Sequence, residues 1–200
     1  MARPRKDEIH SDNRRDDLIV AAARLFREKG YRGATMRDIG RAINMRSGSP
    51  FYHFASKQDL LYACIHDGLR TCLVALEGID RRDLAAEDYF RALTRMHLAY
   101  LLESRDGIVP LVVGEWHHLE GPHREAVLDL RRRFESLWLG AFTRLKEARL
   151  VGRADQRACW YYLGAMHAVT GWYRPGGRMS VARIADDLAD WVLGGPGVAR

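Results

Sequence analysis

The stretch that decides the fold is TMRDIGRAINMRSGSPFYHFASKQDLL, residues 35–61. Thr35 precedes an apolar helical repeat, and Asp38 follows three residues later in the pattern of a capping box. Asn44 tolerates left-handed backbone geometry and is expected to end this helix. A short helix restarts within a few residues with Pro50 in its first turn, where the missing N–H costs no hydrogen bond. Two short helices joined by such a tight turn predict a helix-turn-helix.

Helical periodicity extends in both directions from this stretch. Upstream, apolar residues recur at helical spacing over about 12–29, and Gly30 stands where a left-handed residue would end the helix. Downstream, Ser56 is expected to cap a long helix that begins at Lys57 and continues towards Leu76. Further helices are expected at 86–103, 108–119, 123–149, 154–173 and 181–193. Strand-like alternation is sustained nowhere, so we expect an all-α fold of nine helices.

The composition is that of an ordinary globular protein with a basic excess near its start. The chain has 200 residues, of which 47% are hydrophobic and 29% charged, a balance that supports a buried core. The net charge is +6, and residues 1–60 contain 13 Lys and Arg against 8 Asp and Glu. A basic excess concentrated in one segment predicts contacts with nucleic-acid phosphates.

These patterns divide the chain into four parts. We expect a flexible basic arm at 1–11, a helix-turn-helix DNA-binding domain at 12–60, a second helical domain at 61–193, and a flexible tail at 194–200. The first residues lack the apolar core of a secretory signal, and no window has the roughly 18 uninterrupted apolar residues of a membrane span. We therefore expect a cytoplasmic protein with no membrane partner.

The residues 14–61 resemble the start of the tetracycline-repressor (TetR) family. The resemblance rests on AARLFREKG at 22–30, TMRDI at 35–39, FYHF at 51–54 and SKQDLL at 56–61. It implies a TetR-like homodimer in which the third helix of each subunit enters a major groove of a palindromic DNA operator. It also implies repression that ends when a small effector binds. Two positions depart from the family, which usually has tyrosine where Phe51 stands and an aliphatic residue where Pro50 stands.

The candidate DNA contacts fall into two groups, those that bind phosphates and those that read bases. Thr35 and Lys57 lie at helix N-termini, where free N–H groups and the helix dipole attract phosphate. Tyr52 is a further phosphate donor, whereas for His53 we favour packing over contact. Base reading is expected at the first turn of the third helix, from Arg46, Ser47, Gly48 and Ser49, with Arg46 the strongest candidate for specificity. The basic run at 3–6 either reaches a minor groove or is a solvated tail.

The resemblance implies that the second domain, 61–193, binds the ligand and forms the dimer. This ligand-binding and dimerisation domain is rich in aromatic and apolar residues at helical spacing. Each is more often core than pocket, but together they permit a cavity for a small, mainly apolar effector. The ligand-binding candidates are Met96, Tyr100, Val112, Trp116, Trp138, Tyr162, Met166 and Trp172. The family resemblance implies that the last two helices form the dimer, and they carry more apolar surface than one packing needs. The interface candidates are Tyr161, Ala165, Ala168, Ile184, Leu188 and Trp191.

The same domain resembles a branch of the family that often senses acyl-CoA thioesters of lipid, fatty-acid or steroid catabolism. The resemblance rests on Glu115, on RRRFE at 131–135 and on WYRPGG at 172–177. A fatty-acyl or steroid CoA thioester needs cations for its phosphates, which the three successive arginines offer. Alternatively, Arg131 forms a structural ion pair with Glu115.

Other functional classes find little support. The histidines and carboxylates at 115–123 lack metal-ligand spacing, and neither a nucleophile elbow nor a phosphate-binding glycine loop occurs. We therefore expect neither an enzyme nor a cofactor or metal. Cys64, Cys72 and Cys159 are expected to be reduced, buried thiols. A constitutive DNA-binding protein without a ligand remains an alternative, because a cavity is not visible in a sequence.

Overall fold

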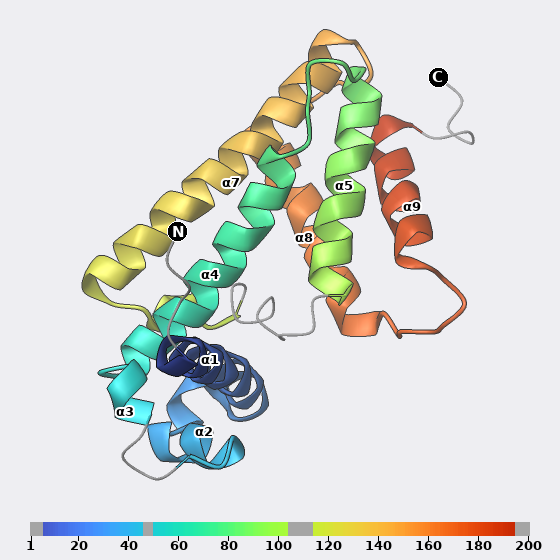
Figure 1. Ribbon diagram of the computed structural model, residues 1–200. Helices are drawn as coiled ribbons and strands as arrows, with labels where there is room; N and C mark the ends of the chain where they lie inside the picture. Colours follow the sequence, from blue (N-terminus) through green and yellow to red (C-terminus); the bar gives the residue numbers. More distant parts are fainter. Residues whose placement is uncertain (1–5, 46–49, 104–113, 195–200) are drawn as a thin grey trace. The chain divides into compact units, whose positions relative to one another are not determined.

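The computed structural model describes residues 6–45, 50–103 and 114–194, with side chains described from Arg14 onward. These residues form helices and no strand (Figure 1), which confirms the all-α prediction. The helices are α1 Lys6–Gly33, α2 Met36–Ala42, α3 Pro50–His53, α4 Lys57–Glu77, α5 Ala86–Glu103, α7 Gly121–Glu147, α8 Gln156–Trp172 and α9 Val181–Leu193, with a 3-10 turn η1 at Trp116–His118. Most of the helix expected at 108–119 lies outside the described residues; of its described part, Gly114 is α-helical and Trp116–His118 form the 3-10 turn η1.

The chain forms two compact units, which we call the head unit and the body unit. The head unit comprises Met1–Leu69 and Arg105–Asp129, and the body unit comprises Arg70–Ser104 and Leu130–Arg200. The sequence had placed residues 61–193 in the second domain. The structure instead groups the described residues 114–129 with the head unit.

Helix α1 supplies one wall of the apolar core of the head unit. It begins at Lys6, earlier than expected, so the segment 6–11 belongs to a helix and not to a flexible arm. Gly30 leaves helical geometry with φ of 70° and ψ of 160°, so the chain kinks at the predicted residue, but not in the left-handed helical conformation, and helical structure resumes as far as Gly33. The core includes Leu18, Ala22, Phe26, Ile39, Leu60 and Leu61, all with no exposed surface.

Reciprocal hydrogen bonds fix the starts of α2 and α4. The Thr35 hydroxyl accepts from the Asp38 N–H at 3.1 Å, and the Asp38 carboxylate accepts from the Thr35 N–H at 3.3 Å, forming the predicted capping box. The Ser56 hydroxyl accepts from the Asp59 N–H at 3.1 Å and donates to the Asp59 carboxylate at 2.7 Å. After α2, Asn44 adopts the expected left-handed conformation with φ of 57°. Local sequence therefore sets where these helices begin and end.

The body unit is built from α5, α7, α8 and α9 around an aromatic core. The Phe90 ring lies 5.9, 5.3 and 5.0 Å from the rings of Trp138, Phe142 and Tyr162. The hydroxyls of Thr94 and Tyr162 share a hydrogen bond of 2.7 Å inside this core. Aromatic pairs from α5, α7 and α8 thus hold the three helices together.

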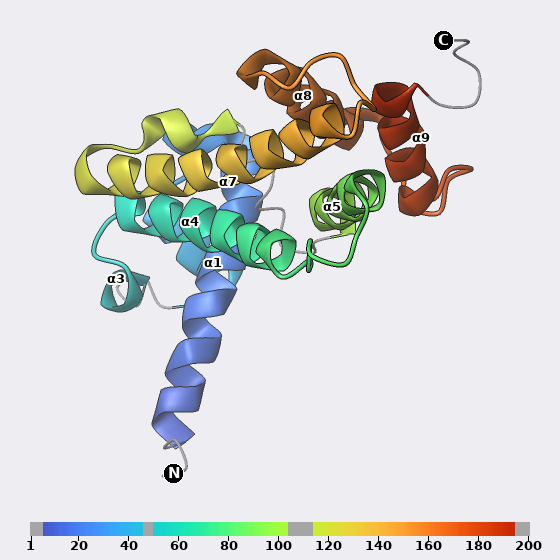
Figure 2. The same cartoon turned by 90° about the horizontal axis from the view of Figure 1, so that it is seen from above.

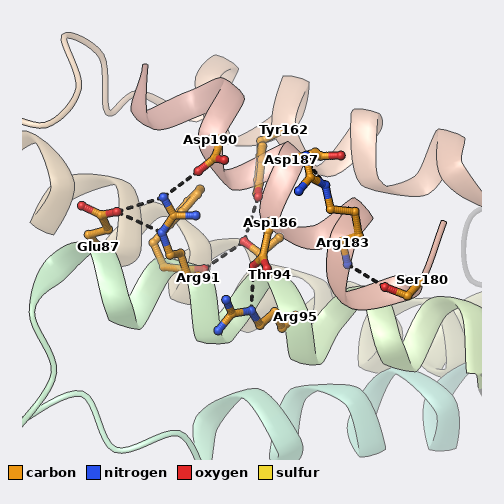
Figure 3. A network of polar contacts seen from close by, with 11 residues as sticks. Glu87, Arg91, Thr94, Arg95, Tyr162, Ser180, Arg183, Asp186, Asp187 and Asp190 are labelled. Atoms are coloured by element: carbon orange, nitrogen blue, oxygen red, sulfur yellow. Dashed lines mark hydrogen bonds and ion pairs between the residues drawn. The ribbon is translucent and has the colours of Figure 1, made fainter. Parts of the chain in front are cut away.

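Helices α5 and α9 lie side by side in both views (Figures 1 and 2). Figure 3 shows how charged side chains join them: Arg91 binds Asp190 at 2.6 Å, and Arg95 binds Asp186 at 2.7 Å. Arg91 also binds Glu87 one turn earlier on α5 at 2.9 Å. Because these pairs are partly exposed, they orient the two helices more than they stabilise them.

All three cysteines are free and buried, as the sequence predicted. Burial raises the pKa of the Cys64 thiol, and it raises the pKa of Cys72 and of Cys159 to about 12. These thiols are therefore core side chains and not nucleophiles.

Candidate functional site

The helix-turn-helix is closed by a tight approach between α2 and α3. A Cβ atom added to Gly40 of α2 would overlap the ring of Pro50, the first residue of α3. The turn is held by the Met45 N–H, which donates to the Gly40 carbonyl at 2.8 Å. Pro50 is buried, as is Phe54 just after α3. The absence of a side chain at Gly40 therefore lets the two helices meet.

Helix α3 exposes two aromatic side chains. Tyr52 is 86% exposed, the side chain of Phe51 is 52% exposed, and His53 is half-buried with its ring 5.5 Å from that of Tyr52. The Tyr52 hydroxyl can thus reach a phosphate, whereas Phe51 has no hydroxyl to offer. The four candidate base readers at 46–49 lie outside the described residues, so their roles remain predictions.

Lys57 has a structural role that the sequence did not predict. Its Nζ donates to the carbonyls of Tyr31 and Ala34 at 2.9 and 3.1 Å and lies 4.3 Å from the centre of the Tyr31 ring. The ammonium therefore closes the end of α1, and a contact with phosphate must use its remaining N–H or the backbone at the start of α4. No local pattern reveals this contact, because its partners lie more than twenty residues away along the chain.

The segment 115–123 is held to the head unit by hydrogen bonds and stacked rings. The Tyr31 N–H donates to the Glu115 carboxylate at 3.2 Å, and the Tyr31 ring stacks on His118 at 5.1 Å. His123 lies 2.7 Å from a carboxylate oxygen of Asp59. Glu115, His118 and His123 thus make structural contacts, and the described residues contain no group of three or more His, Cys, Asp or Glu suited to a metal ion.

The charge of Asp59 is favoured by its neighbours. The Ser56 hydroxyl donates to its carboxylate, and His123 contacts the other carboxylate oxygen. Both contacts lower the pKa of Asp59, with the hydroxyl the larger cause. Likewise, the Thr35 hydroxyl lowers the pKa of Asp38 at the start of α2. Both helix caps therefore carry a fixed negative charge at neutral pH.

The ligand-binding candidates separate into core and surface. Trp138, Tyr162 and Met166 are buried in the body unit, whereas the side chains of Met96 and Trp172 are exposed. Tyr100 is half-buried, Trp116 packs against the apolar core of the head unit, and Val112 lies outside the described residues. Of the described candidates, the structure therefore brings three together in the buried core of the body unit.

The same core contains two polar atoms that have no hydrogen-bond partner among the described residues. They are His97 Nδ1 on α5 and Trp138 Nε1 on α7, on rings whose centres lie 5.7 Å apart. His97 is 2% exposed, and burial, followed by the neighbouring His167, lowers its pKa to about 3. A buried polar group without a partner costs about 1–3 kcal/mol, so such groups are rare and usually have an explanation.

His97 was missed by the sequence analysis. The one signal available was a lone histidine among apolar residues on α5, which is more often a plain core residue.

The structure shows a partner for one member of the arginine run at 131–133: Arg133 pairs with Glu77 at 2.9 Å within the body unit. The expected pair between Arg131 and Glu115 remains a prediction.

The dimer candidates include one side chain that is not at the surface. Ile184 is 3% exposed on the buried face of α9, which packs beside α5, so its side chain is part of the protomer core and not of an interface. By contrast, Tyr161 and Trp191 are 65% and 67% exposed. Ala168 is exposed, and Ala165 and Leu188 are half-buried. Trp160, which the sequence analysis omitted, adds a further exposed ring on α8.

Comparison with known families agrees with this architecture. Residues 18–64 match the family described as bacterial regulatory proteins, tetR family, and residues 83–195 match the tetracyclin repressor-like C-terminal domain. The chain belongs to the TetR family of bacterial transcriptional regulators and is a DNA-binding regulator rather than an enzyme. None of the described helices is long and apolar enough to cross a membrane.

Relatives and solved structures match nearly the whole chain. The HTH-type transcriptional repressor KstR2 of Rhodococcus jostii is 30% identical over 198 residues, covering 96% of this chain and 95% of that protein. KstR2 of Mycolicibacterium smegmatis is 27% identical, covering 92% and 90%. AibR, solved with isovaleryl coenzyme A and operator DNA, has the same fold with a TM-score of 0.81 at 22% identity, covering 90% of this chain and 98% of that chain.

Proposed function

We propose that this protein is a ligand-responsive repressor. As a homodimer it occupies a palindromic operator in the cytoplasm, and a small, mainly apolar effector releases it. The observation that carries the proposal is a helix-turn-helix in a chain whose body unit buries His97 Nδ1 and Trp138 Nε1 without partners among the described residues. A ligand that completes these hydrogen bonds gives the effector-bound state a free-energy advantage that unliganded protein lacks.

The two atoms favour an effector with an oxygen acceptor on an apolar frame. The indole N–H of Trp138 is a donor only, and the imidazole of His97 is neutral at physiological pH because burial lowers its pKa. A thioester carbonyl or a steroid ketone offers such an acceptor. Two similarities support a fatty-acyl or steroid CoA thioester: the relative KstR2 is a repressor, described in Mycobacterium tuberculosis as a ketosteroid transcriptional regulator, and AibR was solved with isovaleryl coenzyme A.

On DNA, the proposed contacts fall into the two groups expected from the sequence. Thr35, Tyr52 and Lys57 hold phosphates, and Tyr52 is 86% exposed. Bases are read by Arg46, Ser47 and Ser49, which precede α3 in the sequence, and Gly48 lets the backbone approach the groove floor closely. His53 packs against Tyr52 and supports it.

The homodimer forms through the outward faces of α8 and α9. Large exposed rings on a soluble surface indicate an interface, and Tyr161 and Trp191 supply two of them. Ala165 and Ala168 let a second helix approach α8 closely, and Leu188 extends the apolar surface on α9. Trp191→Glu is expected to give a monomer in light scattering, whereas Val74→Glu, at an exposed apolar position of α4, leaves the dimer intact.

Operator release tests the function as a whole. Fluorescence anisotropy with DNA from the region upstream of the gene is expected to show specific binding at moderate salt, reversed by one of a panel of acyl-CoA thioesters, fatty acids and steroids. The same compound is expected to raise the melting temperature. Absence of specific binding contradicts the proposal. Specific binding that no compound changes supports the alternative, a constitutive DNA-binding protein.

The effector site has its own matched variants. Trp138→Phe removes the buried donor and is expected to keep operator binding while raising the effector concentration needed for release at least tenfold. Trp172→Phe, at an exposed ring of α8, is the control and leaves release unchanged. Unchanged release in Trp138→Phe would remove this residue from the effector site.

A further inference from the structure

The body unit contains an open groove of about 770 Å³ on the side of α7 that carries Arg133 and Arg144. Its other walls are the segment 77–82, at the end of α4 and just beyond it, and Tyr89 of α5. The groove shares no residue with the proposed effector contacts His97 and Trp138. Its volume is within the range of about 300–1,000 Å³ that small-molecule sites occupy.

The groove has an excess of positive charge. Of its four arginines, Arg82 binds Asp80 at 2.8 Å, and Arg133 binds Glu77 at 2.9 Å, so these two are compensated. Neither of the other two, Arg81 and Arg144, has a carboxylate partner among the described residues. Two uncompensated guanidinium groups match the charge of a phosphate group, which is about −1.5 to −2 at neutral pH.

Arg144 is held in place with a donor to spare. Its Nη2 donates to the Leu84 carbonyl at 2.9 Å, and its guanidinium carbon lies 4.9 Å from the centre of the Tyr89 ring. Its Nη1 is buried and has no hydrogen-bond partner among the described residues. A guanidinium that is already oriented loses little entropy on binding, and an anion would satisfy the unused donor with a charge-assisted hydrogen bond.

Between the arginines, α7 leaves room for a ligand. Gly140 lies one turn before Arg144, and a Cβ atom added there would meet nothing within 4 Å. The helix therefore does not need a glycine at this position for packing, although glycine weakens a helix by about 1 kcal/mol relative to alanine. Because Gly140 and Ala141 are small, they leave space in the groove beside the charged side chains.

We propose that this groove binds a small molecule through a phosphate group, held by Arg144 and Arg81. Tyr89 acts through Arg144, whose guanidinium it supports. The groove shares no residue with the contacts proposed for the effector's oxygen acceptor, His97 and Trp138, so its failure would leave those contacts untouched. The phosphate can belong to a free ion such as pyrophosphate or to a nucleotide.

Calorimetric titration of the full-length protein tests the site with two probes, pyrophosphate and adenosine 3′,5′-bisphosphate. Saturable binding is expected at constant ionic strength, and tighter binding of the bisphosphate would identify a nucleotide as the source of the phosphate. Arg144→Met is expected to weaken binding at least tenfold. Arg157→Met, at an exposed arginine of α8 outside the groove, is the matched control and leaves binding unchanged.

A second variant separates binding from folding, because Arg144→Met also removes the bond to Leu84. Gly140→Leu fills the groove without touching an arginine, and it should preserve or raise the melting temperature while abolishing binding. Binding that is absent in the wild type, or equal in wild type, Arg144→Met and Gly140→Leu, would overturn the proposal.

Discussion

The head unit and the body unit differ in how their polar side chains are hydrogen-bonded. In the head unit, Thr35, Ser56 and Lys57 all bind backbone groups, and two of them also bind a carboxylate three residues away. In the body unit, charged pairs join α5 to α9 near the surface, while His97 and Trp138 each keep a buried polar atom without a partner among the described residues. The head unit has one such atom, Gln58 Oε1, on an amide whose nitrogen binds the His118 carbonyl.

This difference fits the roles proposed for the two units. A DNA-reading element must present its side chains in one geometry, which satisfied caps and a tight turn provide. A ligand-responsive domain instead benefits from interior groups that a ligand completes, because only a differential interaction shifts a conformational equilibrium. The comparison therefore predicts that substitutions in the head unit mainly change stability, whereas those in the interior of the body unit mainly change response.

At neutral pH, the largest expected effect is at the contact between α2 and α3. Gly40→Val places side-chain atoms against the Pro50 ring and is expected to destabilise the head unit by about 3 kcal/mol, with loss of operator binding. Thermal and urea unfolding measure the change. Gly33→Ala is the control, because its Cβ atom would make only an ordinary contact with Lys29. Equal stability of the two variants would show that the approach at Gly40 is not tight.

A smaller loss is expected from Lys57→Met. The substitution keeps the length of the side chain but removes both hydrogen bonds to the end of α1, so we expect a loss of about 1.5 kcal/mol in urea unfolding without DNA. Lys29→Met, at an exposed position of α1, is the control. If the two variants are equally stable while Lys57→Met weakens binding to every DNA sequence, Lys57 serves phosphate contact alone.

His97 makes stability depend on pH. Its folded pKa of about 3 lies below its ordinary value of 6.5, so between these values the unfolded chain takes up a proton that the folded protein does not. Stability is therefore expected to fall as the pH drops below 6.5, by up to about 1.4 kcal/mol per pH unit. In His97→Leu this contribution is absent. Thr94→Val, in the same core, should follow the wild-type pH dependence, and a parallel curve for His97→Leu would contradict the assignment.

The smallest expected effect concerns the cap of α4. Hydrogen bonds from Ser56 and His123 lower the pKa of Asp59, so its contribution is present above the unfolded pKa and is lost as the pH falls through the folded value. Because the side chain is partly exposed, Asp59→Asn is expected to cost about 0.5 kcal/mol at pH 7. The difference from wild type should vanish in strong acid, and a difference that persists there would exclude an ionic origin.

Features that depend on residues close in sequence were predictable. The capping box at Thr35, the left-handed Asn44, the interruption at Gly30 and the helices α5 and α9 all follow from patterns within one or two turns. The family was also recognisable, because the motifs of the DNA-binding head stand in one continuous stretch. Local hydrogen bonds and helical periodicity are written directly into neighbouring residues.

Other features were decided only by the tertiary structure. The contact of Lys57 with Tyr31, the grouping of 114–129 with the head unit, and the burial of Ile184 all depend on residues far apart in sequence. The meeting of His97 with Trp138 is of the same kind, since a helical pattern shows which face is apolar but not which helix covers it. The sequence by itself therefore determined the helices, their caps and the class of protein, whereas packing between distant segments decided which polar atoms are paired and which remain available to a ligand.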